Sequence, residues 1–325
     1  MLARLRSGGV SGFIVRRLLL GLIVLLMVSI VVFAATQALP GDPARAILGR
    51  SATPASLAAL RLKLHLDQPL FSQYWTWLTG LLRGNLGTSL AAQEPVTTLL
   101  APKLVNSAVL VAVSAIVSIP ISIAIGSWAA FRREKIFDTL SSNLLLVMAA
   151  LPEFVVALVL VILLATTVSQ ALPAISTIPP GSRPWNFPSY LVLPALTLVI
   201  AVAPYVARIM RASMIEVLES DYVEMARLKG LPERTVLIRH ALPNALGPVF
   251  QVIALNLAYL AGGIVVVEAV FNYGGIGSGL QEAVINHDLP VVQALAMLIA
   301  AVYVALNLLA DVATIMVTPR LRTRL

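Results

Sequence analysis

Six long apolar stretches limit the folds that this sequence of 325 residues can adopt. Each is about as long as the roughly 20 largely apolar residues that a helix needs to cross a bilayer. Hydrophobic residues make up 59% of the chain and charged residues 12%, whereas charged residues form about 25% of an ordinary soluble domain. One soluble core cannot bury that much apolar surface, because the buried fraction rises slowly with size. The sequence therefore predicts an all-α polytopic membrane protein with six spans, near 13–36, 105–130, 141–168, 190–210, 246–270 and 292–317.

The first stretch has two interpretations. The basic residues Arg4, Arg6, Arg16 and Arg17 at its start, and the small residues Ala34 and Ala35 at its end, are also typical of a cleaved signal peptide. Its unbroken apolar run from 18 to 35 has 18 residues, however, whereas the apolar core of a signal peptide has about 7–15. We therefore expect the stretch to remain as a membrane span.

Lys and Arg are unequally distributed between the stretches. Of these 23 residues, sixteen lie at the N-terminus, after the second or fourth stretch, or at the C-terminus. The short loops on the other side hold only Arg183, and six more lie in the long 37–104 connection, where charge says little about topology. The positive-inside rule then predicts that both termini are cytoplasmic. The net charge of +8 is thus a topology signal, and we predict a lipid bilayer, not nucleic acid, as its partner.

The connection 37–104 shows helical patterns of its own. Thr53 followed by Pro54 predicts a helix start, and Trp75 and Trp77 suit a boundary between water and lipid. We expect helices packed on the membrane domain rather than a docking surface for an external partner. The predicted organisation is a first span with an extracytoplasmic helical segment (1–104) and a five-helix core (105–320).

A short cytoplasmic helix is predicted between the fourth and fifth stretches. Ser220 is a candidate N-cap with Asp221 in the first turn, where the helix dipole favours a carboxylate. Gly230 suits the left-handed position that closes a helix, and Pro232 prevents continuation. The expected helix has about ten residues and is held at a fixed place between two spans.

The same segment resembles the EAA loop of binding-protein-dependent importer permeases. In that pattern Glu-Ala-Ala is followed after three residues by Gly, and after nine more by Ile-any-Leu-Pro. Here the matching residues are Glu224-Met-Ala226, Gly230 and His240-Ala-Leu-Pro243, with Met225 and His240 as departures and the spacing intact. The loop extends over about 211–245.

Further motifs extend the resemblance from about residue 13 to 322, in the same order as in the B-type permeases of dipeptide and oligopeptide importers. They include Leu39-Pro-Gly-Asp-Pro43, Leu66-Asp-Gln-Pro-Leu70, Gly84-Asn-Leu-Gly-Thr-Ser89, Val267-Glu-Ala-Val-Phe271, Asp288-Leu-Pro-Val-Val-Gln293 and Thr318-Pro-Arg320. The resemblance implies the type I fold of ATP-binding-cassette (ABC) importer permeases in a bacterial cytoplasmic membrane. It implies transport of peptides without enzymatic activity in this chain.

The resemblance also implies partners. They are a homologous sister permease of the C type, two ATPase subunits that bind ATP and Mg, and an extracytoplasmic substrate-binding protein. Glu224, Ala226 and Gly230 would contact an ATPase, and Tyr222 and Leu231 lie in the same segment. To these we add Arg227 and Lys229, because they lie on the same short helix. The alternative is a solvated loop whose charges only obey the positive-inside rule.

Several kinds of site are not predicted. The chain has no cysteine, its three histidines have no zinc-ligand spacing, and no phosphate-binding Gly-x-x-x-x-Gly-Lys-Ser/Thr motif or catalytic set occurs, so we expect no bound cofactor or metal. The glycine-rich run around Gly275, Ile276 and Gly277 follows an apolar span. We interpret it as a turn into the last span or a contact with the binding protein.

Two acidic residues lie within predicted spans. Glu153 would lie about 12 residues, roughly 18 Å, into the third span, where a carboxylate costs about 2.5–3.5 kcal/mol on insertion scales. It could line the solute path and attract a peptide amine, or be a protonated acid bonded to a neighbouring helix. We expect Asp311 to pair with Asn307 or with an arginine of the C-terminal tail. Pro120, Pro152, Pro194 and Pro204 interrupt spans and permit kinks.

Other transport functions compete with this interpretation. A self-powered secondary transporter would need inverted repeats or several ionisable groups at the midplane, and we identify one such acid. Nickel, glutathione and other small solutes remain alternatives to peptides, because relatives of the B type carry them.

Overall fold

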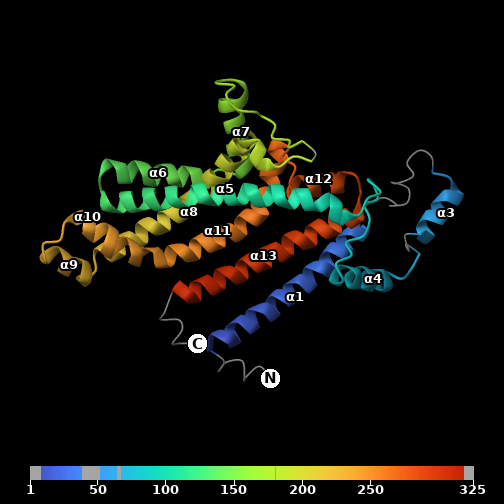
Figure 1. Ribbon diagram of the computed structural model, residues 1–325, viewed down its shortest axis with the longest axis horizontal. Helices are drawn as coiled ribbons and strands as arrows, with labels where there is room; N and C mark the ends of the chain where they lie inside the picture. The colour runs from blue at the N-terminus through green and yellow to red at the C-terminus, as the bar shows by residue number, and fades with distance from the viewer. Residues whose placement is uncertain (1–8, 39–51, 64–66, 180, 318–325) are drawn as a thin grey trace.

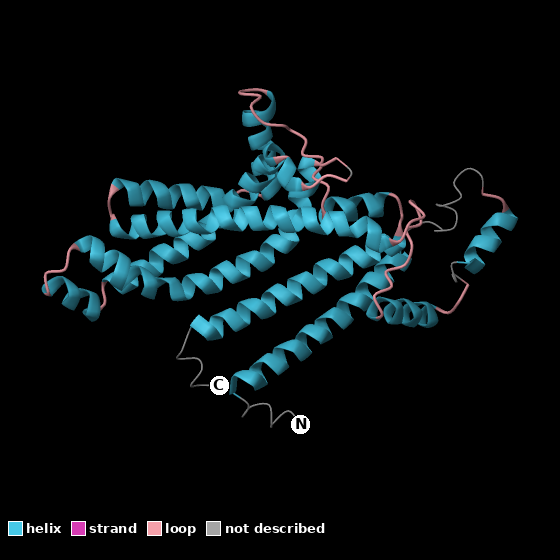
Figure 2. Cartoon of the chain, viewed as in Figure 1, coloured by secondary structure: helices cyan, strands magenta, loops and turns pink. Residues whose placement is uncertain are grey.

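The computed structural model describes residues 9–38, 52–63, 67–179 and 181–317. Within these ranges the chain is helical, with one isolated β-bridge between Thr88 and Pro95 and loops between the helices (Figure 2). The long helices are α1 (Gly9–Ala38), α5 (Val96–Phe131), α6 (Ile136–Ala150), α8 (Pro188–Leu218), α11 (Leu242–Phe271) and α13 (Leu289–Val317). The shorter elements are α3 (Pro54–Lys63), α4 (Leu70–Leu82), α7 (Glu153–Val161), η3 (Ile162–Thr166), η4 (Pro184–Asn186), α9 (Asp221–Leu228), α10 (Glu233–Thr235), η5 (Val236–Ala241) and α12 (Ile276–Ile285).

Every predicted span lies on one of these helices or on a bent pair of them. Four are long and apolar enough to cross a membrane unaided: Gly12–Ala38, Val96–Phe131, Pro188–Leu218 and Leu289–Val312. Two pairs pass the same test together, namely α6 with α7 and η3, bent by 104°, and the two parts of the 233–271 segment, bent by 55°. The all-helical prediction is therefore confirmed for the described chain, which offers four to six candidate spans.

The third span is not the single helix predicted for 141–168. α6 ends at Ala150, Leu151 has an extended backbone (φ −83°, ψ 130°), and α7 begins at Glu153. Pro152 causes the break, because proline lacks an N–H and disfavours helical geometry in the residue before it. Pro120 in α5 and the two prolines of α8 lie inside continuous helices, so they do not interrupt their spans.

The helices form an elongated bundle (Figure 1). α8 packs against α5, α6 and α11, and α1 pairs with α13, which also packs on α11. α9 and α10 lie at one end of the bundle, whereas α3, α4 and α12 lie at the other. The start of α1 and the end of α13 lie near each other, and α7 projects from the bundle beyond its bend.

A stripe of small residues brings α5 against α8. Ser114, Ser118, Ser122, Gly126 and Ala130 recur every four residues on α5, and all are buried. Residues four apart share a helix face, and small side chains let two helix backbones approach closely. At Gly126 an added Cβ would lie only 2.4 Å from the carbonyl oxygen of Ala207, so the approach requires glycine.

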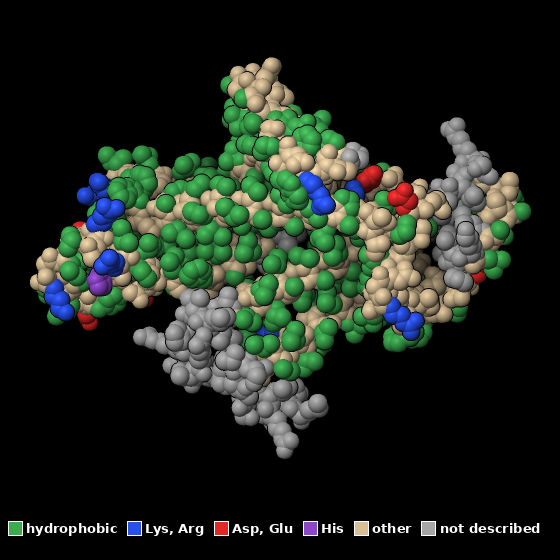
Figure 3. Space-filling view, viewed as in Figure 1, with side chains coloured by type: hydrophobic (Ala, Val, Ile, Leu, Met, Phe, Trp, Pro, Cys, Tyr) green, Lys and Arg blue, Asp and Glu red, His purple; other side chains and the backbone are tan. Residues whose placement is uncertain are grey.

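In contrast to the packed contact between α5 and α8, α1 has many exposed apolar side chains. Leu22, Met27 and Val31 are exposed by 62%, 62% and 65%. Apolar side chains also cover most of the face drawn in Figure 3, whereas Lys and Arg gather at the end where α9 lies. An apolar surface of this extent is what a bilayer-facing helix presents to lipid.

In the segment before α5, α4 packs on α1 as expected, whereas α3 lies apart from the bundle (Figure 1), so the expected packing holds for only one of the two helices. Thr53 caps α3 as predicted, because its Oγ1 accepts the Ser56 N–H at 3.2 Å. On α4, Tyr74 and Trp77 contact Phe33 of α1 through their rings. The motif at 39–43 lies outside the described residues, as do Leu66, the first residue of the motif at 66–70, and 318–320.

Two ion pairs join helices at the end of the bundle where α9 lies. Arg211 of α8 donates from Nε and Nη2 to the two carboxylate oxygens of Asp138 on α6, at 2.5 and 2.7 Å. Asp311 pairs at 3.0 Å with Arg17 of α1, whereas the Asn307 side chain donates to the Tyr303 carbonyl oxygen. The expected pairing of Asp311 with Asn307 is therefore wrong, because the packing of α13 on α1 brings a full charge within reach.

The α5–α8 contact yields a stability prediction. Gly126→Ala should destabilise the protein by about 1–3 kcal/mol, because the new methyl group must force two helices apart. Thermal unfolding in detergent measures this loss. Gly247→Ala on α11 is the matched control, since its Cβ would meet no atom within 4 Å and alanine favours the helix. Equal melting temperatures for the two variants would contradict the close approach.

Candidate functional site

The predicted cytoplasmic helix exists as α9, directly after α8. It has eight residues, Asp221–Leu228, instead of about ten. Ser220 occupies the N-cap position with an extended backbone, but its hydroxyl donates to the Val217 carbonyl oxygen and makes no cap bond. The predicted side-chain cap is therefore wrong, since the end of α8 offers an acceptor closer to hand. Asp221 and Glu224 remain in the first turn, at the positive end of the helix.

Gly230 closes α9 as predicted. Its φ of +75° is a left-handed conformation that L residues other than glycine rarely adopt. The Gly230 N–H donates to the Arg227 carbonyl oxygen at 2.9 Å, and the Leu231 N–H donates to that of Ala226 at 3.4 Å. This pair of bonds is the Schellman arrangement, which satisfies carbonyls left free at a helix end. Pro232 then starts the next helical segment.

The two faces of α9 have different environments. Val223 and Ala226 are buried against Val236 of η5 and the end of α8. An exposed apolar row recurs every three residues on the other face, and its members are Tyr222 (46% exposed), Met225 (53%) and Leu228 (74%). Ala226 thus faces the chain's own core, whereas Met225, the departure from the family pattern, faces outward. Met225 and Leu228 were missed as site residues, although their spacing from Tyr222 was the available signal.

Charged residues link α9 to the next segment. Arg227 donates to Glu233 of α10 at 2.8 Å, and this hydrogen bond raises the pKa of the Arg227 guanidinium above its ordinary value. Both side chains are more than 40% exposed, so the pair contributes at most about 1 kcal/mol. Glu224, Lys229 and Gly230 are exposed beside it.

The α9 segment is attached to two membrane helices. α8 leads into it, and α10 with the π-helical η5 leads out of it into α11. The Ser213 hydroxyl of α8 donates to the Ala245 carbonyl oxygen of α11 at 2.8 Å, which ties these helices together close to the segment. A force on α9 would therefore act on α8 and α11 together.

The glycine-rich corner at the opposite end is organised by a buried acid. Glu268 at the end of α11 accepts the Ser107 hydroxyl and, at 2.6 Å, the Gly277 N–H. A Cβ at Gly275 would lie 2.0 Å from a Glu268 carboxylate oxygen, so that position also requires glycine. Gly275, Ile276 and Gly277 are all buried. Their contact with a binding protein stays a prediction, and within the chain they hold α12 against α5 and α11.

A second buried acid fixes the connection before α5. Asp288 accepts the Ser89 hydroxyl and, at 3.0 Å, the Leu90 N–H. Two motifs far apart in the sequence, Gly84–Ser89 and Asp288–Gln293, therefore meet at one corner.

Glu153 lies at the 104° break, at the first position of α7. Its carboxylate lies against Gly263 of α11, and it lines a small cavity together with Tyr205 of α8 and Tyr259 of α11. The two acids Glu268 and Asp288 have protein partners, whereas Oε1 of Glu153 is buried without a hydrogen-bond partner in the described chain.

Comparison with known proteins identifies the family. Residues 122–323 match the family described as binding-protein-dependent transport system inner membrane component, and residues 10–111 match its N-terminal counterpart. The chain belongs to this family of inner membrane transport components.

Two relatives cover nearly the whole length. The probable peptide ABC transporter permease protein y4tP of Sinorhizobium fredii is 36% identical over 312 residues, 95% of this chain and 99% of the relative. The glutathione transport system permease protein GsiC of Salmonella typhimurium is 36% identical over 311 residues, 95% of this chain and 98% of that one. The chain is accordingly a multi-pass protein of the cytoplasmic membrane.

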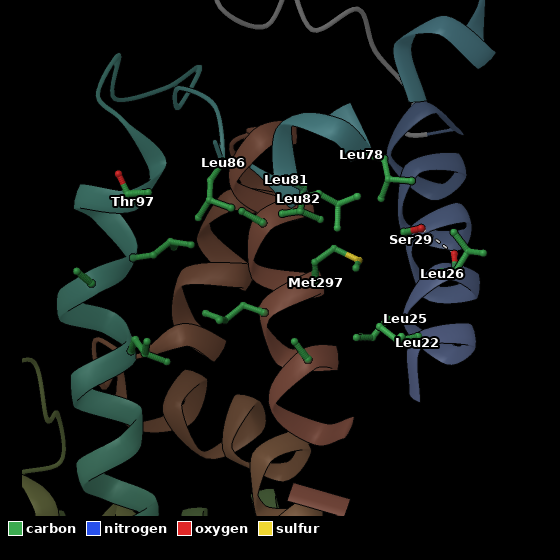
Figure 4. Close-up of a pocket in the computed structure, with 16 residues that line it drawn as sticks. Leu22, Leu25, Leu26, Ser29, Leu78, Leu81, Leu82, Leu86, Thr97 and Met297 are labelled. Atoms are coloured by element: carbon green, nitrogen blue, oxygen red, sulfur yellow. Dashed lines mark hydrogen bonds between the residues drawn. The ribbon is translucent and has the colours of Figure 1, made fainter. Parts of the chain in front are cut away.

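The permease also has an apolar cavity of about 590 Å³ between α1, α4, α5 and α13 (Figure 4). Leucines dominate its lining, and the hydroxyl of Ser29 there already donates to the Leu26 carbonyl oxygen and bonds the hydroxyl of Tyr74. Such a cavity offers a polar solute almost no hydrogen bonds, so it is not a candidate solute site.

The closure of α9 can be tested by hydrogen–deuterium exchange. Gly230→Val should speed exchange of the amides at 230 and 231, because a β-branched residue at φ +75° strains the turn that bonds them. Gly230→Asn is the control, since asparagine tolerates the left-handed region. Slow exchange at both amides in the valine variant would refute the role of Gly230.

Proposed function

We propose that this permease is the membrane subunit of an ATP-driven peptide importer. The observation that carries the proposal is α9, a short helix closed at Gly230 that presents an apolar row outside the membrane helices. Membership in a binding-protein-dependent family supports it. Peptides are the solute that the name of the S. fredii relative indicates.

Glutathione is a second candidate solute. A relative named as a glutathione permease has the same 36% identity as one named as a peptide permease. Glutathione is itself a small peptide, so both names point to one class of solute. The separate binding protein would select among its members, and the ligand that raises the melting temperature of that protein would identify the cargo.

In the proposed complex two ATPase subunits bind ATP and Mg, and a sister permease completes the solute path. The exposed row Tyr222, Met225 and Leu228 would bury itself in an ATPase groove, with Glu224 and Lys229 at its rim and Gly230 and Leu231 at its end. Ala226 and Arg227 would instead connect α9 to its own chain, through the core contact and the Glu233 pair. An external binding protein would deliver the solute near the Gly275–Gly277 corner.

We further propose six spans with both termini cytoplasmic. The four long helices, the two bent pairs and the basic residues near α9 support this topology. The first span with its external segment (1–104) and the core (105–320), which contains the coupling loop at 211–245, would be its two parts.

The coupling role predicts the effect of a charge on the exposed row. In a reconstituted complex, Leu228→Asp should abolish solute-stimulated ATP hydrolysis, because it places a carboxylate in an apolar contact. The fold should persist, since Leu228 is 74% exposed. Leu228→Met keeps an apolar side chain and should behave like the wild type. Normal coupling in the aspartate variant would show that α9 does not contact the ATPase in this way.

The absence of cysteine makes the topology directly testable. In membranes that contain the permease without its ATPase subunits, a cysteine in place of Leu228 should react with a membrane-impermeant maleimide only in inside-out vesicles. One in place of Gln281, exposed on α12, should react only from outside intact spheroplasts. Labelling of both from the same side would overturn the proposed orientation.

A further inference from the structure

The break between α6 and α7 creates a cavity that the coupling role does not use. Its volume is about 210 Å³, and Glu153 lies in its wall. The rest of the wall includes Ala150 at the end of α6, Ala201 and Tyr205 of α8, and Tyr259 of α11.

The cavity lies halfway along the membrane helices. Ala201 is 13 residues from the start of α8 and 17 from its end. At about 1.5 Å per residue it is roughly 20 Å from one end and 26 Å from the other. Glu153 therefore lies beside the middle of α8, at the start of a new helix, and its place at the membrane midplane stays a prediction.

Glycine makes room for the carboxylate. A Cβ at Gly263 would lie 2.9 Å from Oε1 and 3.0 Å from Oε2 of Glu153, so any other residue would displace the acid. At Gly262, one residue earlier, an added Cβ would meet no atom within 4 Å. Oε1 is buried and makes no hydrogen bond in the described chain, although the Tyr259 hydroxyl is close enough to interact with the carboxylate.

The cavity wall is complementary to a cation. α6 ends at Ala150, and its last carbonyls carry the negative end of the helix dipole into the wall. Tyr205 and Tyr259 add hydroxyl oxygens, and none of the lining residues is Lys or Arg.

This face is unsuited to lipid. Tyr205 and Tyr259 are exposed by 45% and 52%. Lipid at the midplane offers tyrosine hydroxyls no hydrogen bonds, so polar groups at this depth face protein or a water-filled path. The cavity therefore opens toward another subunit or the solute path.

We propose that Glu153, Tyr205 and Tyr259 form a binding site for a primary ammonium group, the N-terminal amine of a peptide on its way through the membrane. The proposal rests on the peptide-import function above and names the part of the solute that this chain recognises. A cavity of about 210 Å³ is smaller than the pockets of about 300–1,000 Å³ that enclose whole ligands. It can hold the ammonium end of a peptide while the remainder lies in the path.

The test compares uptake of one peptide with a free N-terminus and the same peptide N-acetylated, by the whole complex in proteoliposomes. Both are supplied at concentrations that saturate the binding protein. Glu153→Gln should lower the preference for the free amine at least about tenfold, which is the loss of one charged hydrogen bond. Gly263→Ala should do the same by displacing the carboxylate, and Gly262→Ala is its matched control with wild-type preference.

Each other outcome has a definite meaning. An unchanged preference for the free amine in Glu153→Gln would overturn the site. An equal loss of uptake of both peptides, together with a lower melting temperature, would also overturn it, because Glu153 would then have a structural role. Uptake that needs Na⁺ in the wild type and not in Glu153→Gln would assign the cavity to a metal cation instead. A wild-type complex that hydrolyses ATP but imports neither peptide would refute the peptide-import function, and the ammonium site with it.

Discussion

The close contact between α5 and α8 is the constraint on which the rest of the structure depends. Small residues at every fourth position, with Gly126 against the backbone of Ala207, bring the two helices together. α8 in turn packs on α6, α7 and α11, and it ends at the α9 segment. Within a bilayer, apolar side chains gain little by leaving lipid for one another, so close packing of this kind has to supply much of the association energy.

Buried acids explain why the loops at the two ends are well defined. Glu268 holds the corner at Gly275–Gly277, Asp288 holds the connection at Ser89, and Asp138 holds Arg211. In each case protein donors compensate for the cost of burying the carboxylate. Glu153 differs, because its buried Oε1 makes no hydrogen bond within the described chain and the Tyr259 hydroxyl is its neighbour. This contrast is the reason for proposing Glu153 as a ligand-binding residue, whereas the other three acids stabilise the fold.

The positions of the helices could be predicted from the sequence because a bilayer requires a minimum apolar length. The end of α9 was predictable for a similarly local reason, since few residues besides glycine adopt the conformation of Gly230. Three-dimensional packing decided the rest. Four prolines were predicted to interrupt their spans, yet the helix is broken only at Pro152. The partner of Asp311 and the inward face of Ala226 likewise depend on which helices pack together.

α11 connects the two proposed sites in one element. Its first turns continue from η5 and the α9 segment, and its second half carries Gly263 opposite Glu153. The bend of 55° lies between these parts, at the step from Leu257 to Gly262. In the proposed complex, a force that an ATPase exerts on α9 would reach the cavity through a helix already bent beside it. Because the carboxylate lies directly against Gly263, a small change of this bend would alter the room for an ammonium group. If both proposals hold, α11 would couple energy input at one end of the chain to release of the solute at the cavity.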